Sequence, residues 1–158
     1  MSAYEDGLRA METLLARDCQ FALATAENGV PSLRYVDMFF DGGCFYVVTH
    51  AGSRKVREIE QNPRVALCNR RFFAFSGVAR NIGHPLKPEN RAIRAKLVEA
   101  FRPWYFKHND EADEGMCYLR IEPETGFFHR DGTGYKMDFV RKTANAFPFA
   151  FDTVLTED

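Results

Sequence analysis

Apolar residues near the N-terminus recur at the spacing of a helix. Four of them fall at i, i+4, i+7 and i+11, namely Tyr4, Leu8, Met11 and Leu15. This period predicts a helix with one buried face, ending near Arg17. At its start, Ser2 and Glu5 fit a capping box, in which each side chain accepts a hydrogen bond from an otherwise unpaired backbone N–H.

The pattern then changes to short β-forming runs separated by turn residues. Three such runs follow one another: Cys19 to Ala26, Pro31 to Phe40 and Cys44 to His50. Asn28-Gly29 tolerates the positive φ of a tight hairpin, and Asp41-Gly42-Gly43 marks a second turn. We therefore expect a meander of three antiparallel strands.

The middle of the chain predicts a short helix from Arg54 to Gln61, with Ser53 as its N-cap and Asn62-Pro63 as its end. Val65 to Cys68 has no polar alternation, so this predicted strand should be covered on both faces. The other expected elements are strands at Phe72 to Arg80, Met116 to Ile121, Gly126 to Arg130 and Tyr135 to Val140, and a helix at Glu89 to Phe101.

The tail from Ala144 to Asp158 carries Phe147, Phe149 and Phe151 at period two. These rings should be covered either by the chain's own barrel or by a partner chain. Six to eight antiparallel strands with a few short helices predict a mainly β (α+β) fold, a closed or partly closed barrel, because closure removes exposed sheet edges.

Composition narrows the class of protein. The 158 residues suit one domain, 1–158, and fifteen Phe, six Tyr and one Trp argue against disorder. A formal net charge of −1 gives no overall field for nucleic acid or an anionic membrane. We expect neither a transmembrane segment nor a signal peptide, and the four scattered cysteines suggest reduced thiols in a cytoplasmic protein.

The segment from Val48 to Lys55 carries the most informative chemistry. A predicted strand ends there, Gly52 permits a sharp turn, and a helix begins at Ser53 with two cations, Arg54 and Lys55. A helix N-terminus favours an anion, and an arginine fork beside a lysine suits a phosphate dianion. The same residues also begin ordinary surface helices, whose cations are solvated, so both interpretations remain open.

Other candidate chemistry is weaker. Arg34 lies within a predicted strand, either solvated or in reach of the same anion. The four histidines show no metal-ligand spacing, and no common catalytic motif is complete, so we expect no metal site. Nucleic-acid binding through Arg54 to Arg57 and Arg70-Arg71 is less favoured than a solvated helix face.

Taken in order, several segments resemble the pyridoxamine phosphate oxidase-like family of FMN-binding split barrels. The matching segments are Phe21-Ala22-Leu23-Ala24-Thr25 to Gly29-Val30-Pro31, Arg34-Tyr35-Val36, Phe45-Tyr46-Val47-Val48-Thr49, Ser53-Arg54-Lys55, Asn62-Pro63-Arg64-Val65-Ala66-Leu67 and Phe75-Ser76-Gly77-Val78-Ala79. Met38-Phe39-Phe40 stands where the oxidase has a lysine, and its C-terminal arginine–histidine motif has no counterpart. The resemblance is thus to a relative of the oxidase, not to the oxidase proper.

The resemblance implies a split β-barrel that binds FMN at a homodimer interface. It places the FMN phosphate on Ser53, Arg54 and Lys55, and the flavin along Arg34, Tyr35, Val36, Val48 and Thr49. We expect an FMN-dependent oxidoreductase that takes electrons from NADH, NADPH or an unknown small-molecule substrate. The alternative is a non-catalytic module that binds flavin, haem or a deazaflavin for storage, sensing or stress protection.

Overall fold

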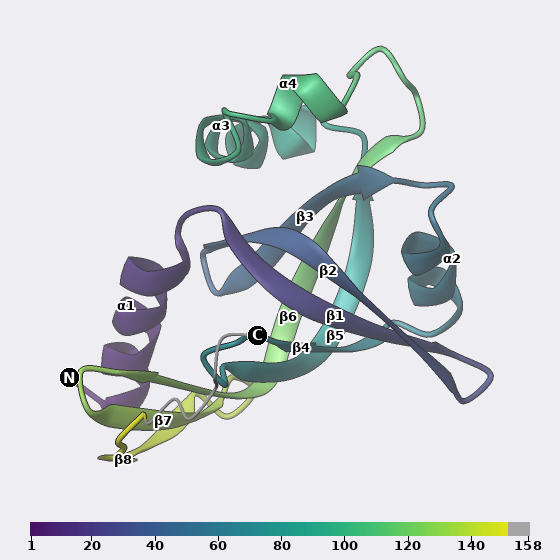
Figure 1. Ribbon diagram of the computed structural model, residues 1–158. Helices are drawn as coiled ribbons and strands as arrows, with labels where there is room; N and C mark the ends of the chain where they lie inside the picture. Colours follow the sequence, from purple (N-terminus) through teal and green to yellow (C-terminus); the bar gives the residue numbers. More distant parts are fainter. Residues whose placement is uncertain (152–158) are drawn as a thin grey trace, which may run out of the picture.

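Eight antiparallel strands form the body of the protein, which the computed structural model describes over residues 1–151 (Figure 1). The strands are β1 (Cys19–Glu27), β2 (Val30–Asp41), β3 (Cys44–His50), β4 (Arg64–Cys68), β5 (Ala74–Gly83), β6 (Met116–Arg130), β7 (Thr133–Asp138) and β8 (Thr143–Pro148). The helices are α1 (Ala3–Leu15), α2 (Arg54–Gln61), the 3₁₀ turn η1 (Pro88–Asn90), α3 (Arg91–Ala100) and α4 (Tyr105–His108).

Six of these strands close into a barrel. They lie in the order β3-β2-β1-β4-β5-β6, and a further pairing between β3 and β6 completes the ring. Strands β7 and β8 continue the sheet beyond the C-terminal half of β6. The prediction of a mainly β fold with six to eight antiparallel strands and short flanking helices is confirmed.

Strands β2 and β3 are paired over only part of their length. These strands pair only at Phe39–Tyr46, Phe40–Phe45 and Asp41–Cys44. Beyond that point β2 stays paired with β1 while β3 pairs with β6, so the two strands diverge. The divergence leaves a split in the barrel wall, lined by the facing edges of both strands.

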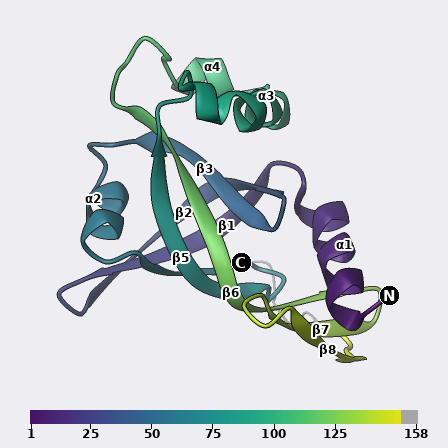
Figure 2. The same cartoon turned by 180° about the vertical axis from the view of Figure 1, so that it is seen from behind.

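Aromatic rings fill the barrel interior. Phe45 lies at the centre, with its ring centroid 5.0 Å from that of Phe40, 5.1 Å from Phe75 and 5.6 Å from Phe21. A second apolar cluster lies under α3 and α4, and its buried members are Phe39, Leu97, Phe101, Tyr105, Met116 and Tyr118. The two views show α1 and α2 on opposite sides of the barrel, with α3 and α4 across one end (Figures 1 and 2).

Local signals in the N-terminal half are confirmed. Ser2 and Glu5 form both hydrogen bonds of the capping box at the start of α1. In the β1–β2 hairpin, Asn28 and Gly29 have φ of 51° and 78°, the left-handed values that the Asn-Gly pair permits. Helix α2 spans the predicted residues and buries Val56 and Ile59.

Three expectations about strands are wrong. Strand β5 begins at Ala74, because Phe72 has a φ of 65° and lies in a turn. The two predicted strands from Met116 to Arg130 are the single strand β6, since a shift in register beside Gly77 accommodates Pro123. On β4, Ala66 and Cys68 are exposed, so only one face of that strand is covered within the chain.

The C-terminal aromatic residues pack against the extension of the barrel. The Phe147 and Phe149 ring centroids lie 6.1 and 5.1 Å from that of Phe127. The Phe151 ring stacks on His129 at 4.7 Å. Of the two alternatives for covering these rings, the chain's own strand β6 provides the contacts. The rest of the predicted tail, 152–158, lies outside the described residues.

Candidate functional site

Glu58 is a buried carboxylate that gathers polar groups from three elements. Its side chain is 2% exposed and accepts hydrogen bonds from Thr25 on β1, Ser32 on β2 (3.2 Å) and Arg54 Nε on α2 (2.6 Å). The bond from Thr25, with those from Arg54 and Ser32, lowers the pKa of Glu58 to about 2, although burial acts in the opposite direction. Glu58 is therefore ionised at neutral pH.

The β1–β2 hairpin places these partners. Thr25 pairs directly with Ser32, and Leu23 pairs with Arg34, so one face of the hairpin presents both hydroxyls and the guanidinium to α2. Arg34 Nη1 donates to Thr25 Oγ1 at 2.7 Å and to the Leu23 carbonyl at 3.2 Å. The side chain is thus directed inward and held in place, with only 23% of its surface exposed.

The structure brings the three predicted cations together. Arg34 Nη2 lies 3.7 Å from Glu58 Oε2, on the same carboxylate that binds Arg54. Lys55 is half-buried, and its pKa is lowered first by burial and then by the charge of Arg34. Arg34 and Arg54 therefore share one carboxylate, and Lys55 lies close enough to Arg34 for their positive charges to interact.

Ser53 and Thr49 join this cluster at the start of α2. Ser53 has the extended backbone of an N-cap, and its Oγ lies 3.5 Å from Thr49 Oγ1. Its side chain caps no backbone N–H within the described residues. The first-turn N–H groups of a helix have no partner inside the helix, so this end of α2 presents donors. Donors and cations together favour an anion.

A cavity of about 500 Å³ opens in the split between β2 and β3, next to this cluster. We call it the β2–β3 cavity, and its lining residues are Tyr35, Val36, Asp37, Val47, Val48, Lys55, Trp104, His108 and Asn109. Four of the predicted site residues line it: Tyr35, Val36, Val48 and Lys55. The other four, Arg34, Thr49, Ser53 and Arg54, are not in its lining but belong to the cluster at the start of α2.

Two neighbouring carboxyl groups, Asp37 in the lining of the β2–β3 cavity and Asp18 outside it, form a second polar feature of this region. Asp37 lines the cavity, and burial together with a hydrogen bond to Asp18 raises its pKa to about 6. Asp18 Oδ2 also accepts a 2.8 Å hydrogen bond from the indole of Trp104, next to the start of α4. This bond ties the helices that cover the cavity to the first strand of the barrel.

Sequence reasoning missed Glu58, Asp37 and Trp104. A signal for Glu58 was present, because Arg54 and Glu58 stand at the i, i+4 spacing of helical ion pairs. No comparable signal marked Trp104, which packs beside a helix of four residues that carries no periodic pattern. Asp37 was not singled out, because Asp18 is distant in the sequence and is brought beside it only by the pairing of β1 with β2.

Other site types find little support in residues 1–151. No group of three or more His, Cys, Asp or Glu side chains lies together there as a metal ion would need. All four cysteines are free thiols. No helix in this part of the chain is long and apolar enough to span a membrane.

Comparison with known proteins places the chain in a family. The sequence model of the family described as pyridoxamine 5'-phosphate oxidase matches residues 8–130. General stress protein 26 of Bacillus subtilis (strain 168) is 31% identical over 105 residues, which cover 65% of this chain and 74% of that protein.

Two further relatives extend the comparison. Pyridoxine/pyridoxamine 5'-phosphate oxidase of Rippkaea orientalis (strain PCC 8801 / RF-1) is 34% identical over 96 residues, covering 60% of this chain but only 42% of the oxidase. Among solved structures, the haem storage protein HutZ of Vibrio cholerae shares the fold with a TM-score of 0.61 and 18% identity, over 81% of this chain and 94% of HutZ. Since the family match spans most of the barrel, the chain belongs to the pyridoxamine 5'-phosphate oxidase family.

Proposed function

We propose that the protein binds FMN in the β2–β3 cavity and is an FMN-dependent oxidoreductase. The observation that carries this proposal is the position of Lys55, which lines the cavity while standing in the cation cluster at the start of α2. One end of the cavity is thus suited to a phosphate, and the rest follows the edges of two strands.

The residues present fit such a cofactor. Ser53, Arg54 and Lys55, with Arg34 behind them, would hold the phosphate. Where β2 and β3 diverge, alternate residues of each strand have backbone N–H and C=O groups that no neighbouring strand pairs, and those beside the cavity would bond the polar edge of a flavin. Apolar and aromatic side chains along the cavity would exclude water from the ring.

The flavin, when bound, supplies two-electron transfer, and the protein supplies binding, orientation and electrostatics. We propose NADH or NADPH as the electron donor and a small molecule as the acceptor. Asp37 is the titratable group in the lining whose pKa, about 6, allows it to exchange a proton near neutral pH.

A second function is favoured by the names of the relatives. General stress protein 26 and a haem storage protein share this fold, so a non-catalytic module that binds flavin, deazaflavin or haem is the competing proposal. The visible spectrum of the purified protein separates these ligands. Bleaching of bound flavin by NADH or NADPH favours the oxidoreductase, and a flavin that neither nucleotide reduces favours the binding module.

We further propose that the flavin-binding unit is a homodimer. Leu33 and Tyr35, on the outer face of β2, are 69% and 66% exposed. Leu33 borders a shallow hollow of about 270 Å³ whose other walls include Ala24 and Ala66, its neighbours across β1 and β4. An apolar knob beside an apolar hollow is self-complementary, so a two-fold axis would seat Leu33 of one chain against the hollow of the other.

The phosphate assignment is tested by titrating the flavin-free protein with FMN. Lys55→Gln should weaken FMN binding roughly ten-fold or more, because one charge-assisted hydrogen bond is worth about 1.5–3 kcal/mol. Flavin fluorescence quenching measures the dissociation constant.

The matched control is Arg57→Gln, which removes a cation from the exposed face of the same helix. It should leave FMN affinity within two-fold of that of the unmodified protein, because solvent-exposed charges contribute little interaction energy. Equal FMN affinities for Lys55→Gln and the unmodified protein would contradict the assignment of the phosphate to the start of α2.

A further inference from the structure

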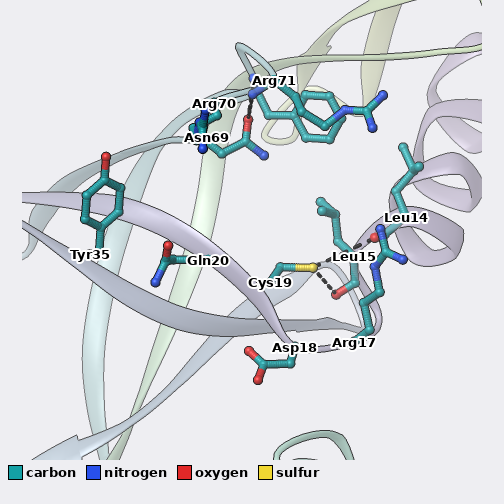
Figure 3. Close-up of a pocket in the computed structure, with 11 residues that line it drawn as sticks. Leu14, Leu15, Arg17, Asp18, Cys19, Gln20, Tyr35, Asn69, Arg70 and Arg71 are labelled. Carbon is teal, nitrogen blue, oxygen red and sulfur yellow. Dashed lines mark hydrogen bonds between the residues drawn. The ribbon is translucent and has the colours of Figure 1, made fainter. Parts of the chain in front are cut away.

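A second cavity, of about 380 Å³, lies between the end of α1 and the loop joining β4 to β5 (Figure 3). We call it the arginine cavity, and its lining residues are Leu14, Leu15, Arg17, Asp18, Cys19, Gln20, Tyr35, Asn69, Arg70, Arg71 and Phe73. Figure 3 shows Arg17 on one side and the loop with Asn69, Arg70 and Arg71 on the other, with Cys19 between them. None of the expected site residues except Tyr35 belongs to it.

The charge around this cavity is unbalanced. Arg17, Arg70 and Arg71 form no ion pair with any residue between 1 and 151, whereas eight other arginines in this part of the chain have carboxylate partners. Asp18 is the one carboxylate in the lining, and it is already engaged by the Trp104 indole. Three cations against one carboxylate attract an anion.

The loop that carries two of these arginines is held in a fixed shape. Asn69 Oδ1 accepts hydrogen bonds from the backbone N–H groups of Arg71 and Phe73, both at 3.0 Å. His129 Nε2 lies 2.9 Å from the Arg71 carbonyl oxygen. Phe72, between these anchors, has a φ of 65°, a conformation that costs an ordinary L-residue free energy and often occurs at binding sites.

Arg71 is also oriented by aromatic rings. Its guanidinium carbon lies 5.9 Å from the centroids of both Phe73 and Phe151. Rings at this distance attract the cation and restrict its rotamers. An anion that binds Arg71 therefore meets a side chain whose position is already limited, which lowers the entropic cost of binding.

The remaining lining residues indicate the chemistry of the uncharged part of the ligand. Leu14, Leu15 and Phe73 give the cavity an apolar side, while Gln20 and Asn69 add amides. Such a mixture accommodates a small organic molecule with an apolar body and one anionic group. Inorganic anions alone would leave the apolar wall without a partner.

We propose that the arginine cavity binds a small organic anion, a carboxylate or a phosphate monoester with an apolar body. Arg17 and Arg71 hold the anionic group, and Leu15 and Phe73 contact the body. The proposal goes beyond FMN binding, because the arginine cavity and the β2–β3 cavity share only Tyr35.

The residue shared by the two cavities indicates a role for the bound anion. Tyr35 lines both cavities, and the neighbouring residues Asp18 and Asp37 line one cavity each. A molecule in the arginine cavity is therefore a neighbour of the cofactor, and we assign it as the substrate. That role rests on the proposed function, whereas binding itself does not.

Binding is tested on the purified full chain, in flavin-free and FMN-loaded forms, with benzoate, phenyl phosphate and the neutral analogue benzamide. Isothermal titration calorimetry should detect at least one of the two anions at millimolar concentration or below, and benzamide at least ten-fold more weakly. The tighter of the two anions distinguishes a carboxylate ligand from a phosphate ester. Absence of binding by both anions, or equal binding of benzamide, would overturn the proposal.

Variants locate the site. Arg17→Gln and Arg71→Gln should each weaken the anion roughly ten-fold, while Arg9→Gln, an exposed arginine of α1 outside the lining, should not. The backbone bonds of Arg71 to Asn69 and His129 remain possible in its variant, and circular dichroism checks that the fold persists. Unchanged anion affinity in both variants contradicts the inference. Loss of FMN affinity in these variants, with no effect on the anions, assigns the arginines to the cofactor and refutes this inference while leaving the FMN proposal intact.

Discussion

At the scale of single residues, Glu58 organises the region around α2. One ionised carboxylate binds Arg54, lies close to Arg34 and accepts bonds from two hydroxyls of the β1–β2 hairpin. A buried charge is tolerated only when its partners are in place, so these contacts depend on one another. The same carboxylate fixes the guanidinium groups that would face a phosphate.

We predict that Glu58→Gln lowers the stability of the protein in a pH-dependent way. The folded pKa of Glu58, about 2, is below the ordinary glutamate value of 4.5, so ionisation stabilises the fold above pH 4.5 and this contribution is lost as the pH falls towards 2. Urea unfolding should show a lower midpoint for the variant at pH 7 and a smaller difference from the unmodified protein at pH 3.

The matched control is Glu60→Gln, an exposed glutamate two residues further along the same helix. It should unfold at nearly the same urea concentration as the unmodified protein at both pH values. A constant difference for Glu58→Gln across this pH range would show that its charge does not stabilise the fold.

At the scale of elements, β6 connects the barrel to its extension. Its first residues pair with β3, its middle with β5 and its last residues with β7. The register shift between Ser76 and Gly77 lets β5 follow β6 past Pro123, a residue that cannot donate a ladder hydrogen bond. A side chain at Gly77 would collide with backbone atoms of Glu122 and Pro123.

Gly77→Ala should therefore destabilise the protein by about 2 kcal/mol, since backbone atoms of a paired strand cannot move aside like a flexible side chain. Thermal unfolding should show a lower midpoint, by several degrees. Ser76→Ala, at the exposed neighbouring position, is the control and should change the midpoint little. An unchanged midpoint for Gly77→Ala would mean that the crossing of β5 and β6 has room for a methyl group.

The sequence predicted those elements whose signals are local. The Asn28-Gly29 turn, the capping box and the start of α2 each depend on a few adjacent residues, and each is confirmed. The continuity of β6 could not be predicted, because it depends on a partner strand that bends with it at Gly77. The left-handed Phe72 was likewise hidden, since Asn69 and the distant His129 hold its loop.

For the candidate site, residue types were easier to predict than their surroundings. Lys55 and Val48 line the β2–β3 cavity, and Arg34 and Arg54 share a carboxylate next to it. The residue types around the start of α2 predicted Arg54 and Lys55, whereas Val48 was implied by the family resemblance. The carboxylate between the arginines was not foreseen, because a glutamate on a short polar helix normally faces solvent. Its burial follows from the hairpin that packs on α2, which local pattern does not show.

At the scale of the whole molecule, one outer face of the barrel is unusually apolar. Leu33 and Tyr35 lie on the outer face of β2. Their cross-strand neighbours on β1 and β4 are alanines and Cys68. The uncovered face of β4 belongs to this surface. A second copy of the chain is the partner that would cover it in our proposal.

We predict that Leu33→Glu shifts the protein to monomers, because a charge at the centre of an apolar interface loses its hydration. Sedimentation velocity measures the change against the unmodified chain. Leu86→Glu serves as the control, since Leu86 is 59% exposed but lies in the loop between β5 and η1, outside the hollow beside Leu33. If the unmodified chain already sediments as a monomer at tens of micromolar, the dimer proposal is wrong.

The buried carboxylate under the arginines has a consequence for which phosphates the protein can accept. Three cations and one carboxylate leave the start of α2 with two uncompensated positive charges, in a chain whose formal net charge is −1. A phosphate monoester dianion brings two negative charges and would make the occupied site electrically neutral. A phosphodiester brings one and would leave a cation uncompensated, so under our proposal Glu58 would favour terminal phosphates over phosphodiesters.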